Sequence, residues 1–147
     1  MPLRPRDLDA HQYRALAEVR YQIRRFLAFS ESAVRDAGVE PQQHQLLLVL
    51  HALGPAQKPN IRTVAQRLLI HHNSAVELVR RSVERGLVER KTSSRDRREA
   101  SLHLTAFGRR VVRRLSLSHR SELRCAAPSL MAALQALLPA ERKKRAA

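Results

Sequence analysis

Aromatic residues are scarce in this chain: it has two tyrosines, three phenylalanines and no tryptophan among 147 residues. Proteins that read single-stranded nucleic acid stack bases on exposed rings, so this scarcity argues against that class. Only four glycines are present, and they form no phosphate-binding glycine loop. Since the sequence also lacks a nucleophile-elbow motif and a clustered carboxylate pair, we predict that the protein is not an enzyme.

Cysteine and long apolar runs are also lacking. The single cysteine, Cys125, allows no internal disulfide, which agrees with a reducing compartment. No apolar run approaches the ~20 residues of a membrane-spanning helix, and the stretch MPLRPRDLDAHQYR lacks the apolar core of a signal peptide. We therefore expect a cytoplasmic protein without a membrane partner, in which Cys125 is buried and inert rather than a redox sensor.

Acidic side chains are few relative to basic ones. The chain has 13 Asp and Glu residues against 28 Lys and Arg, which gives a net charge of +15. Such an excess favours a polyanionic partner, nucleic acid first and an anionic membrane surface second. A basic protein that is merely soluble is the alternative. The length fits one domain that is large enough to bury a core.

The seven histidines do not form a metal-binding pattern. No Cys/His cluster has the spacing of a zinc site. His71 and His72 are adjacent, so they cannot easily bind one ion from one face. His44 and His51 lie two helical turns apart, roughly 10 Å along the axis. We therefore expect neither a metal nor another cofactor.

Apolar periodicity predicts a chain that is mostly helical. A long amphipathic helix spans about residues 7–37 and stops at Gly38. The next helix begins at Pro41 and is apolar nearly all round at 46–50, so we expect it at the centre of the packing. A third helix over about 62–69 buries its apolar residues, which are Val64, Ala65, Leu68 and Leu69. A fourth helix is capped by Asn73 or Ser74 and ends at Gly86.

A β-hairpin follows the fourth helix. Residues 87–91 and 100–105 read as strands, because Ala100, Leu102 and Leu104 alternate with polar residues. The polar stretch 92–98 joins them as a loop. Thr105 is a plausible N-cap for a helix over about 106–125, and Pro128 separates a last helix over 129–138.

The order of these elements, two short helices and then a basic hairpin, indicates a winged helix-turn-helix. On the fourth helix, Val76, Val79 and Val83 form a packing stripe. Off that stripe lie side chains that pair with base edges, since Asn pairs with adenine, Arg with guanine and Glu with the N4 amine of cytosine. These side chains are Asn73, Ser74, Glu77, Arg80, Arg81 and Glu84. An ordinary solvated helix face is the alternative.

The hairpin loop strengthens the prediction of DNA binding. Arg95, Arg97 and Arg98 repel one another around a single Asp96 unless an anion relieves them. Asp96 can orient Arg98, and an arginine held in this way enters a narrow, A·T-rich minor groove at lower entropic cost. A solvated turn is the alternative.

The segments HHNSAVELVRRSVERGLVER and SSRDRREASLHLTAFG resemble the MarR (multiple-antibiotic-resistance regulator) family of transcription factors. The resemblance extends from PQQHQLLLVLHAL to AFGRRVVRRL, nearly the whole chain. Its most specific part is the Asp-x-Arg of the wing, Asp96 and Arg98, followed by Leu104, Thr105 and Gly108.

This resemblance implies a mainly α fold with a small β-hairpin wing, a winged helix-turn-helix with terminal dimerisation helices. We expect one domain over 1–147, with a DNA-binding lobe at about 42–105 and dimerisation helices at about 7–37 and 106–140. The resemblance implies a homodimeric transcriptional regulator that binds double-stranded DNA at specific sequences. It would act on a pseudo-palindromic operator as a repressor that a small molecule releases.

The resemblance also implies site residues. The DNA-binding positions that it implies are Asn73, Ser74, Glu77, Arg81, Asp96 and Arg98. The position of His72 and the charges of Arg80, Arg95 and Arg97 add these four residues to the predicted DNA-binding set. The candidate effector-binding residues, expected in a crevice between the dimerisation helices and the lobe, are Tyr21, Arg25, Phe29, His44 and His51. Two positions depart from the family pattern: Arg80 replaces a frequent Asp, and Ser82 replaces a core Leu, which we expect to loosen the fourth helix.

Two other functions remain open. A nonspecific packager of nucleic acid would explain the charge and would show a steep salt dependence without sequence preference. A protein-interaction module would use the same fold to dock a partner, although the arginines of the hairpin favour that only if the partner is acidic.

Overall fold

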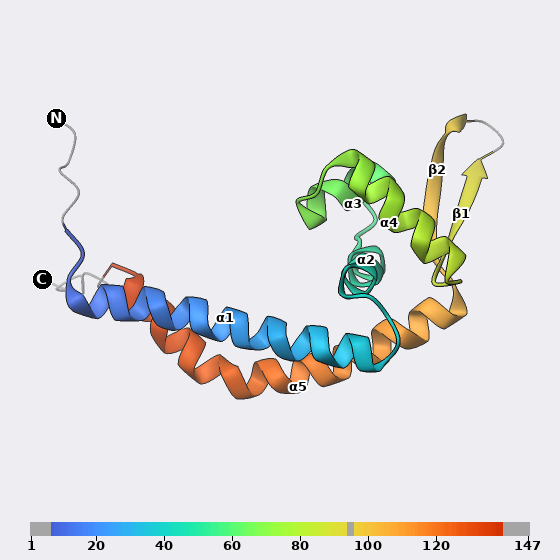
Figure 1. Ribbon diagram of the computed structural model, residues 1–147. Coiled ribbons are helices and arrows are strands. Elements are labelled where there is room, and N and C mark those ends of the chain that lie inside the picture. The colour runs from blue at the N-terminus through green and yellow to red at the C-terminus, as the bar shows by residue number, and fades with distance from the viewer. Residues whose placement is uncertain (1–6, 94–95, 140–147) are drawn as a thin grey trace, which may run out of the picture. The chain divides into compact units, whose positions relative to one another are not determined.

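A computed structural model describes residues 7–93 and 96–139 (Figure 1). The chain divides into two compact units: the second holds residues 30–119, and the first combines the segments on either side of it. The elements are α1 (Ala10–Asp36), α2 (Pro41–Ala52), α3 (Ile61–Leu68), α4 (His72–Glu84), β1 (Val88–Ser93), β2 (Asp96–Leu104) and α5 (Ala106–Leu137). The prediction of a mainly helical fold with one antiparallel hairpin is confirmed.

Helix α2 lies at the centre of the second unit, as predicted, and contacts α3, α4 and β2. Leu46 and Leu47 are fully buried, whereas Leu48 is 42% exposed, so the helix is not buried all round. Besides these two leucines, the fully buried core includes Val34, Val64, Val79, Leu87 and Val112. Residues from α1, α3, α4, α5 and the hairpin therefore share one core.

The hairpin is longer than predicted. Its strands pair antiparallel from Val88 opposite Leu104 to Ser93 opposite Asp96, with an irregularity between Thr92 and Ser93. The predicted loop over 92–98 is therefore wrong, because most of it continues the strands. The physical reason is that ladder hydrogen bonds satisfy backbone groups in this ribbon whatever the polarity of the side chains.

Helix α4 begins earlier and faces another way than predicted. His71 is its N-cap residue, so Asn73 and Ser74 lie in the first turn instead of capping it. Its buried residues are Ala75, Leu78, Val79 and Ser82, and Val83 is 37% exposed, so the predicted valine stripe is wrong except at Val79. The buried face includes two small side chains, Ala75 and Ser82, which a search for large apolar residues overlooks.

Ser82 is fully buried on that face of α4. Its hydroxyl donates a 2.8 Å hydrogen bond to the carbonyl oxygen of Leu78, one turn earlier. A buried hydroxyl is costly only when it lacks a partner. The serine is therefore accommodated in the core by its own helix.

Helix α3 ends one residue before the predicted end. Asn60 caps its start, since the Asn60 Oδ1 accepts a 2.9 Å hydrogen bond from the amide of Thr63. Leu69 follows the helix with a positive φ of 55° and is 92% exposed, so the prediction that it is buried is wrong. The chain must turn there toward α4, and the turn directs this side chain to solvent.

Helix α5 starts at a tight junction with the hairpin. The Thr105 Oγ1 accepts a 3.0 Å hydrogen bond from the amide of Gly108 and donates to the carbonyl of Gly86 at 2.6 Å, which confirms the predicted cap. A Cβ at Gly108 would overlap the carbonyl oxygen of Leu87. Only glycine therefore lets α5 lie this close to the backbone before β1.

Helix α5 also runs through Pro128, so the predicted break there is wrong. A proline inside a helix removes one hydrogen bond and crowds the preceding turn. Ala126 and Ala133 are buried on either side of it. The helix is therefore packed on both sides of the proline.

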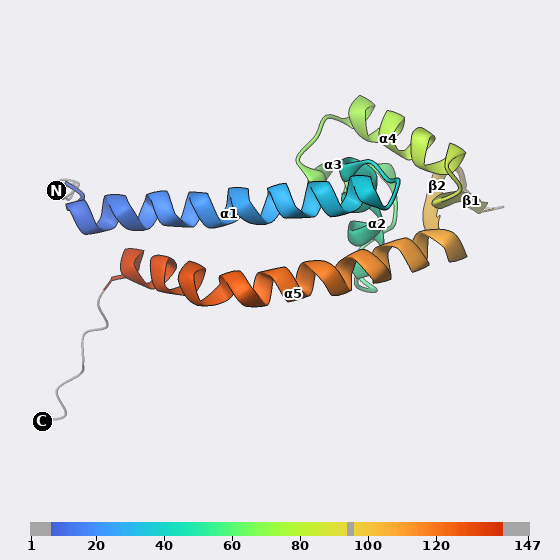
Figure 2. The ribbon, with the colours of Figure 1, turned by 60° about the horizontal axis from the view of Figure 1, so that its bottom comes forward.

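In the first unit, residues 10–29 of α1 run beside residues 120–137 of α5, as both views show (Figures 1 and 2). Ala15, Ala126 and Ala133 are buried, but many large apolar side chains stay exposed. These are Tyr13, Leu16, Tyr21, Ile23, Leu27, Leu123, Met131 and Leu134. Within the described residues, no helix is long and apolar enough to cross a bilayer.

Cys125 belongs to this first unit and is exposed. The prediction of a buried cysteine is therefore wrong. Burial of cysteine is a statistical preference of a small apolar side chain, and here neighbouring positions such as Ala126 take the buried face of α5.

Candidate nucleic-acid interface

Helix α4 presents a polar face to solvent, because Leu78, Val79 and the residues that share their side pack into the core. The exposed side chains of its first turns are His72, Asn73, Ser74 and Glu77. His71 and His72 lie at the start of the helix, as expected. Exposed polar side chains therefore occupy the first turns of α4.

Arg80, on the same face, is held by two carboxylates of α4. Its Nε donates a 2.9 Å hydrogen bond to the Glu77 Oε2, and its guanidinium also pairs with Glu84. The hydrogen bond from Arg80 lowers the pKa of the Glu77 carboxyl, and the Arg80 pKa is raised in return. Both partners stay charged, and their charges compensate each other along this face.

Arg81 points in a different direction. It is half-buried, and its Nη2 lies 3.3 Å from the Oε2 of Glu40, the N-cap residue of α2. Its Nη1 lies 3.9 Å from the Glu77 Oε1. Its buried Nε has no hydrogen-bond partner among the described residues. Arg81 therefore connects α4 to the start of α2 in addition to any role on the surface.

The hairpin supplies the second part of the predicted site. Arg95 lies outside the described residues. The backbone of Asp96, Arg97 and Arg98 belongs to β2, while their side chains lie outside the described part of the chain. Asp96 pairs with Ser93, and Arg97 and Arg98 lie in the strand at the irregularity before Ala100, which pairs with Thr92.

Helix α3 adds basic residues that the sequence analysis missed. A polar hollow of about 450 Å³ is lined by Lys58, Arg62 and Arg67 together with Gln57, Asn60, Thr63 and Gln66. None of the residues that line it is acidic. Within the described part of the chain, no ion pair involves Arg62 or Arg67. The available signal was the polar face of this short helix opposite Val64.

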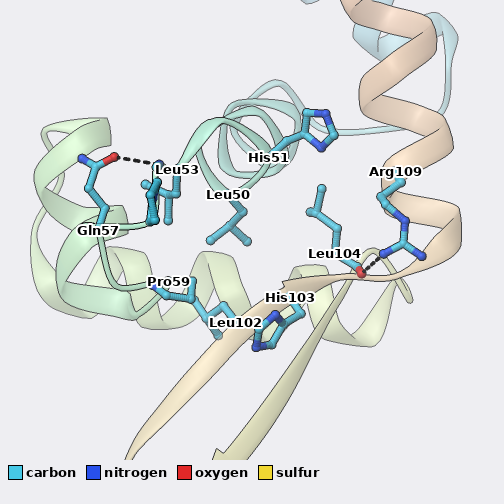
Figure 3. A pocket seen from close by; sticks show the side chains of 11 residues that line it. Leu50, His51, Leu53, Gln57, Pro59, Leu102, His103, Leu104 and Arg109 are labelled. Carbon is cyan, nitrogen blue, oxygen red and sulfur yellow. Dashed lines mark hydrogen bonds between the residues drawn. The ribbon is translucent and has the colours of Figure 1, made fainter.

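A second hollow lies between the end of α2, the loop before α3, β2 and the start of α5 (Figure 3). Its volume is about 370 Å³, and its apolar residues include Leu50, Leu53, Leu102 and Leu104. Its polar side chains are His51, Gln57, His103 and Arg109. The Arg109 Nη1 donates to the Leu104 carbonyl at 2.9 Å, which holds the guanidinium beside the hollow.

The same region contains a hydrogen bond between the hairpin and the helical part of the lobe. The amide of Leu102 in β2 donates to the carbonyl oxygen of Pro59 at 2.7 Å. Pro59 lies just before the cap of α3. The outer edge of the wing is therefore attached to the loop that leads into the helix-turn-helix.

The structure divides the five candidate effector residues between the two units. Tyr21 and Arg25 are exposed and Phe29 is half-buried in the first unit, while His44 and His51 belong to the second. His51 lines the 370 Å³ hollow. The expected crevice between the units stays a prediction.

His44 is buried and packs edge-on against His119 of α5, with ring centroids 4.8 Å apart. Burial, reinforced by the neighbouring His119, lowers the pKa of His44 to about 4. Burial also lowers the pKa of His119. Both rings are therefore neutral at pH 7. Within the described ranges, no three His, Cys, Asp or Glu side chains gather where they could hold a metal ion.

Comparison with known proteins gives one family model and several solved structures to which the chain is similar. The model of the MarR family matches residues 37–99, which include α2, α3, α4 and β1. A comparison with curated protein sequences gives no match. Among solved structures, AbsC, a MarR family transcriptional regulator from Streptomyces coelicolor, is 18% identical with a TM-score of 0.69, covering 85% of this chain and 84% of its own.

Two further structures were solved with ligands. A mutant of MepR from Staphylococcus aureus, bound to an oligodeoxyribonucleotide, is 16% identical with a TM-score of 0.56 and covers 83% of this chain and 82% of its own. CouR from Rhodococcus jostii, bound to p-coumaroyl-CoA, is 22% identical with a TM-score of 0.58 and covers 76% and 82%. The chain has the fold of MarR-family transcriptional regulators, and the resemblance inferred from its sequence is confirmed.

Proposed function

We propose that this protein is a sequence-specific transcriptional regulator that binds double-stranded DNA as a homodimer in the cytoplasm and acts as a ligand-responsive repressor. The observation that carries the proposal is the polar face of α4, presented beside a basic hairpin within one compact unit. In a winged helix-turn-helix, the second helix enters the major groove. The DNA-bound MepR structure has a similar fold and supports this reading.

The first turns of α4 are the part that reads bases. The N-terminal residues of a recognition helix contact base edges. Asn73 can make a bidentate pair with adenine, and Glu77 can accept from the N4 amine of cytosine. His72 and Ser74 lie on the same exposed end. Arg80 and Arg81, each held by a carboxylate, sit at the edge of this contact and position the helix.

The wing contributes the arginines of its tip. We assign Arg98 to the minor groove and Asp96 to its orientation, with Arg95 and Arg97 near phosphates. The support is the run of three arginines around one aspartate in the sequence and the negative potential of narrow minor grooves.

The homodimer is proposed from the exposed apolar side chains of the first unit, such as Tyr21 and Met131. A second copy that covers them would place two recognition helices in major grooves about 34 Å apart, one turn of DNA. Sedimentation at micromolar concentration tests this, and a monomer would contradict it.

The 370 Å³ hollow is the proposed effector site. Its volume falls in the ~300–1,000 Å³ range of small-molecule sites. Arg109, His51 and His103 stand over apolar walls, and no residue that lines it is acidic. A small, partly apolar anion fits this chemistry. The ligand of CouR supports responsiveness to small molecules in this fold.

The test is selection of duplexes from a random pool at near-physiological salt, with wild type and Arg98→Ala in parallel. An inverted repeat recovered by wild type and bound more weakly by the variant is the expected result. The alternative, a nonspecific packager, is favoured by the +15 charge. It predicts that no sequence is enriched and that retention depends on salt alone.

A further inference from the structure

Leu69, in the turn between the two helices of the helix-turn-helix, has an unfavourable backbone conformation and an unfavourable exposure for an apolar residue. Leu69 is 92% exposed, and its φ is +55°. Among the residues that the structure describes, it is the only non-glycine with a positive φ. Leu68 and Ile70, on either side, pack against the core. An apolar side chain in solvent, on a sterically disfavoured backbone, gains nothing from folding.

The backbone conformation itself has a clear cause. The amide of Leu69 donates to the carbonyl of Gln66 at 3.4 Å, and that of Ile70 donates to Ala65 at 3.1 Å, so the two close the end of α3. Glycine is the usual residue at such a left-handed helix end. Glycine would make the same bonds without steric cost, so the turn explains the conformation but not the leucine.

The position of Leu69 suggests what the side chain contacts. It stands two residues before His71, the N-cap of α4. That end of α4 carries the exposed Asn73 and Ser74 and is the end that enters the major groove. The C5-methyl group of thymine is the apolar group on the base edges of that groove. An exposed leucine beside the turn that reads bases is complementary to this methyl group.

We propose that Leu69 is a specificity-determining residue that packs against a thymine methyl group in each half of the operator. The inference rests on the proposed DNA-binding function and adds an apolar contact to the polar ones of α4. It also gives a reason for a leucine at a position where glycine would relieve the strain of the turn.

The experiment uses the operator recovered by selection. Each thymine is replaced in turn by deoxyuridine, which lacks only the methyl group, and dissociation constants are measured for wild type and Leu69→Gly. Wild type should lose about fourfold in affinity at one thymine per half-site, the effect of one buried methyl group. Leu69→Gly should bind the unmodified operator more weakly and show no loss at that thymine.

Two controls separate contact from folding. Leu69→Gly should have a melting temperature equal to or above that of wild type, because the left-handed strain is relieved. Leu48→Ala, which removes another exposed leucine, on α2, should keep the wild-type response to deoxyuridine.

Three outcomes would overturn the inference. Leu69→Gly with wild-type affinity and profile would show that the side chain contacts nothing. An equal loss on all duplexes would show a sugar or phosphate contact instead of a base contact. If wild type selects no operator, the proposed function fails and this inference fails with it.

Discussion

The two helices of the helix-turn-helix carry their arginines in opposite ways. On α4, Arg80 pairs with Glu77 and Glu84, and Arg81 pairs with Glu40. On α3, Arg62 and Arg67 line a hollow without acidic residues. Residues 76–85 contain three arginines and two glutamates, and Glu40 of another helix adds a third carboxylate to this group in space. Attraction for phosphates depends on the net field, whereas base reading depends on individual donors and acceptors.

This difference implies a division of roles within the proposed function. In that proposal, helix α3 would set affinity for the DNA backbone through Arg62 and Arg67. Helix α4 would set sequence preference, and its ion pairs would fix the orientation of Glu77, Arg80 and Arg81. Four measurements break or sharpen this contrast, from the largest expected effect to the smallest.

Gly108→Ala should remove both roles together. The new Cβ meets the carbonyl of Leu87, which as backbone cannot move aside easily. We expect a loss of about 2–3 kcal/mol in unfolding free energy, measured by thermal or urea denaturation. Gly54→Ala is the matched control, since nothing lies within 4 Å of its added Cβ. If Gly108→Ala keeps wild-type stability, α5 does not depend on that close approach.

Acid should also weaken the lobe that holds both helices. The pKa of His44 is about 4 in the folded protein against an ordinary 6.5, so between these pH values the unfolded chain binds more protons. The free energy of unfolding is therefore unaffected by His44 above pH 6.5 and decreases as the pH falls toward 4, in total by about 3 kcal/mol. The lowered pKa of His119 acts in the same direction.

Urea denaturation at pH 7.5 and 4.5 measures this loss. His44→Gln should show a smaller decrease than wild type between the two pH values. His51→Gln removes an exposed histidine of the same helix and should keep the wild-type decrease. Equal decreases in all three proteins would mean that the buried pair does not titrate as inferred.

Removing Arg62 and Arg67 together should lower affinity for every duplex. If both contact phosphates, the slope of log K against log salt should fall by about 2, and affinity near physiological salt by roughly 10-fold. Filter binding on the selected and a scrambled duplex measures both quantities. Arg20→Ala with Arg24→Ala removes the same charge from exposed positions of α1 and should have a smaller effect. Lost preference between the duplexes would contradict the assignment to α3.

Glu77→Gln should act on sequence preference with the smallest change. It removes one of the two carboxylates that hold Arg80 and one acceptor oxygen, so affinity for scrambled duplex should rise roughly two- to fivefold while selectivity for the operator falls. Glu31→Gln, which breaks the exposed pair with Arg35 on α1, controls for the charge. Unchanged selectivity would mean that Glu77 serves only to hold the arginine.

The sequence predicted the elements better than their faces. Proline at 41, glycine at 38 and the cap at Thr105 mark real helix boundaries, because each acts through local backbone chemistry. The prediction of the buried face of α4 was wrong in part because Ala75 and Ser82 are buried there. Their burial results from close packing with other elements, which hydropathy does not reveal. Leu69 was misplaced for a related reason: its exposure follows from the turn between two helices and not from its own side chain.

The sequence predicted the exposed polar positions at the start of α4 but not the electrostatic surroundings of its arginines. The polar positions of α4 follow from helical spacing. The pairing of Arg81 with Glu40 joins residues far apart in the chain, so it had no signal in the sequence. The basic residues of α3 were visible, but their significance depends on the absence of nearby carboxylates, which is a three-dimensional property.

The hydrogen bond from the amide of Leu102 to the carbonyl of Pro59 makes hydrogen exchange at this amide a measure of wing detachment. Leu102 is almost fully buried, and its N–H points to the loop before α3 at 2.7 Å. Such an amide exchanges its hydrogen with solvent deuterium only when β2 separates from that loop. Its exchange rate therefore reports the free energy of detaching the wing, in the free protein and with DNA or a small molecule bound.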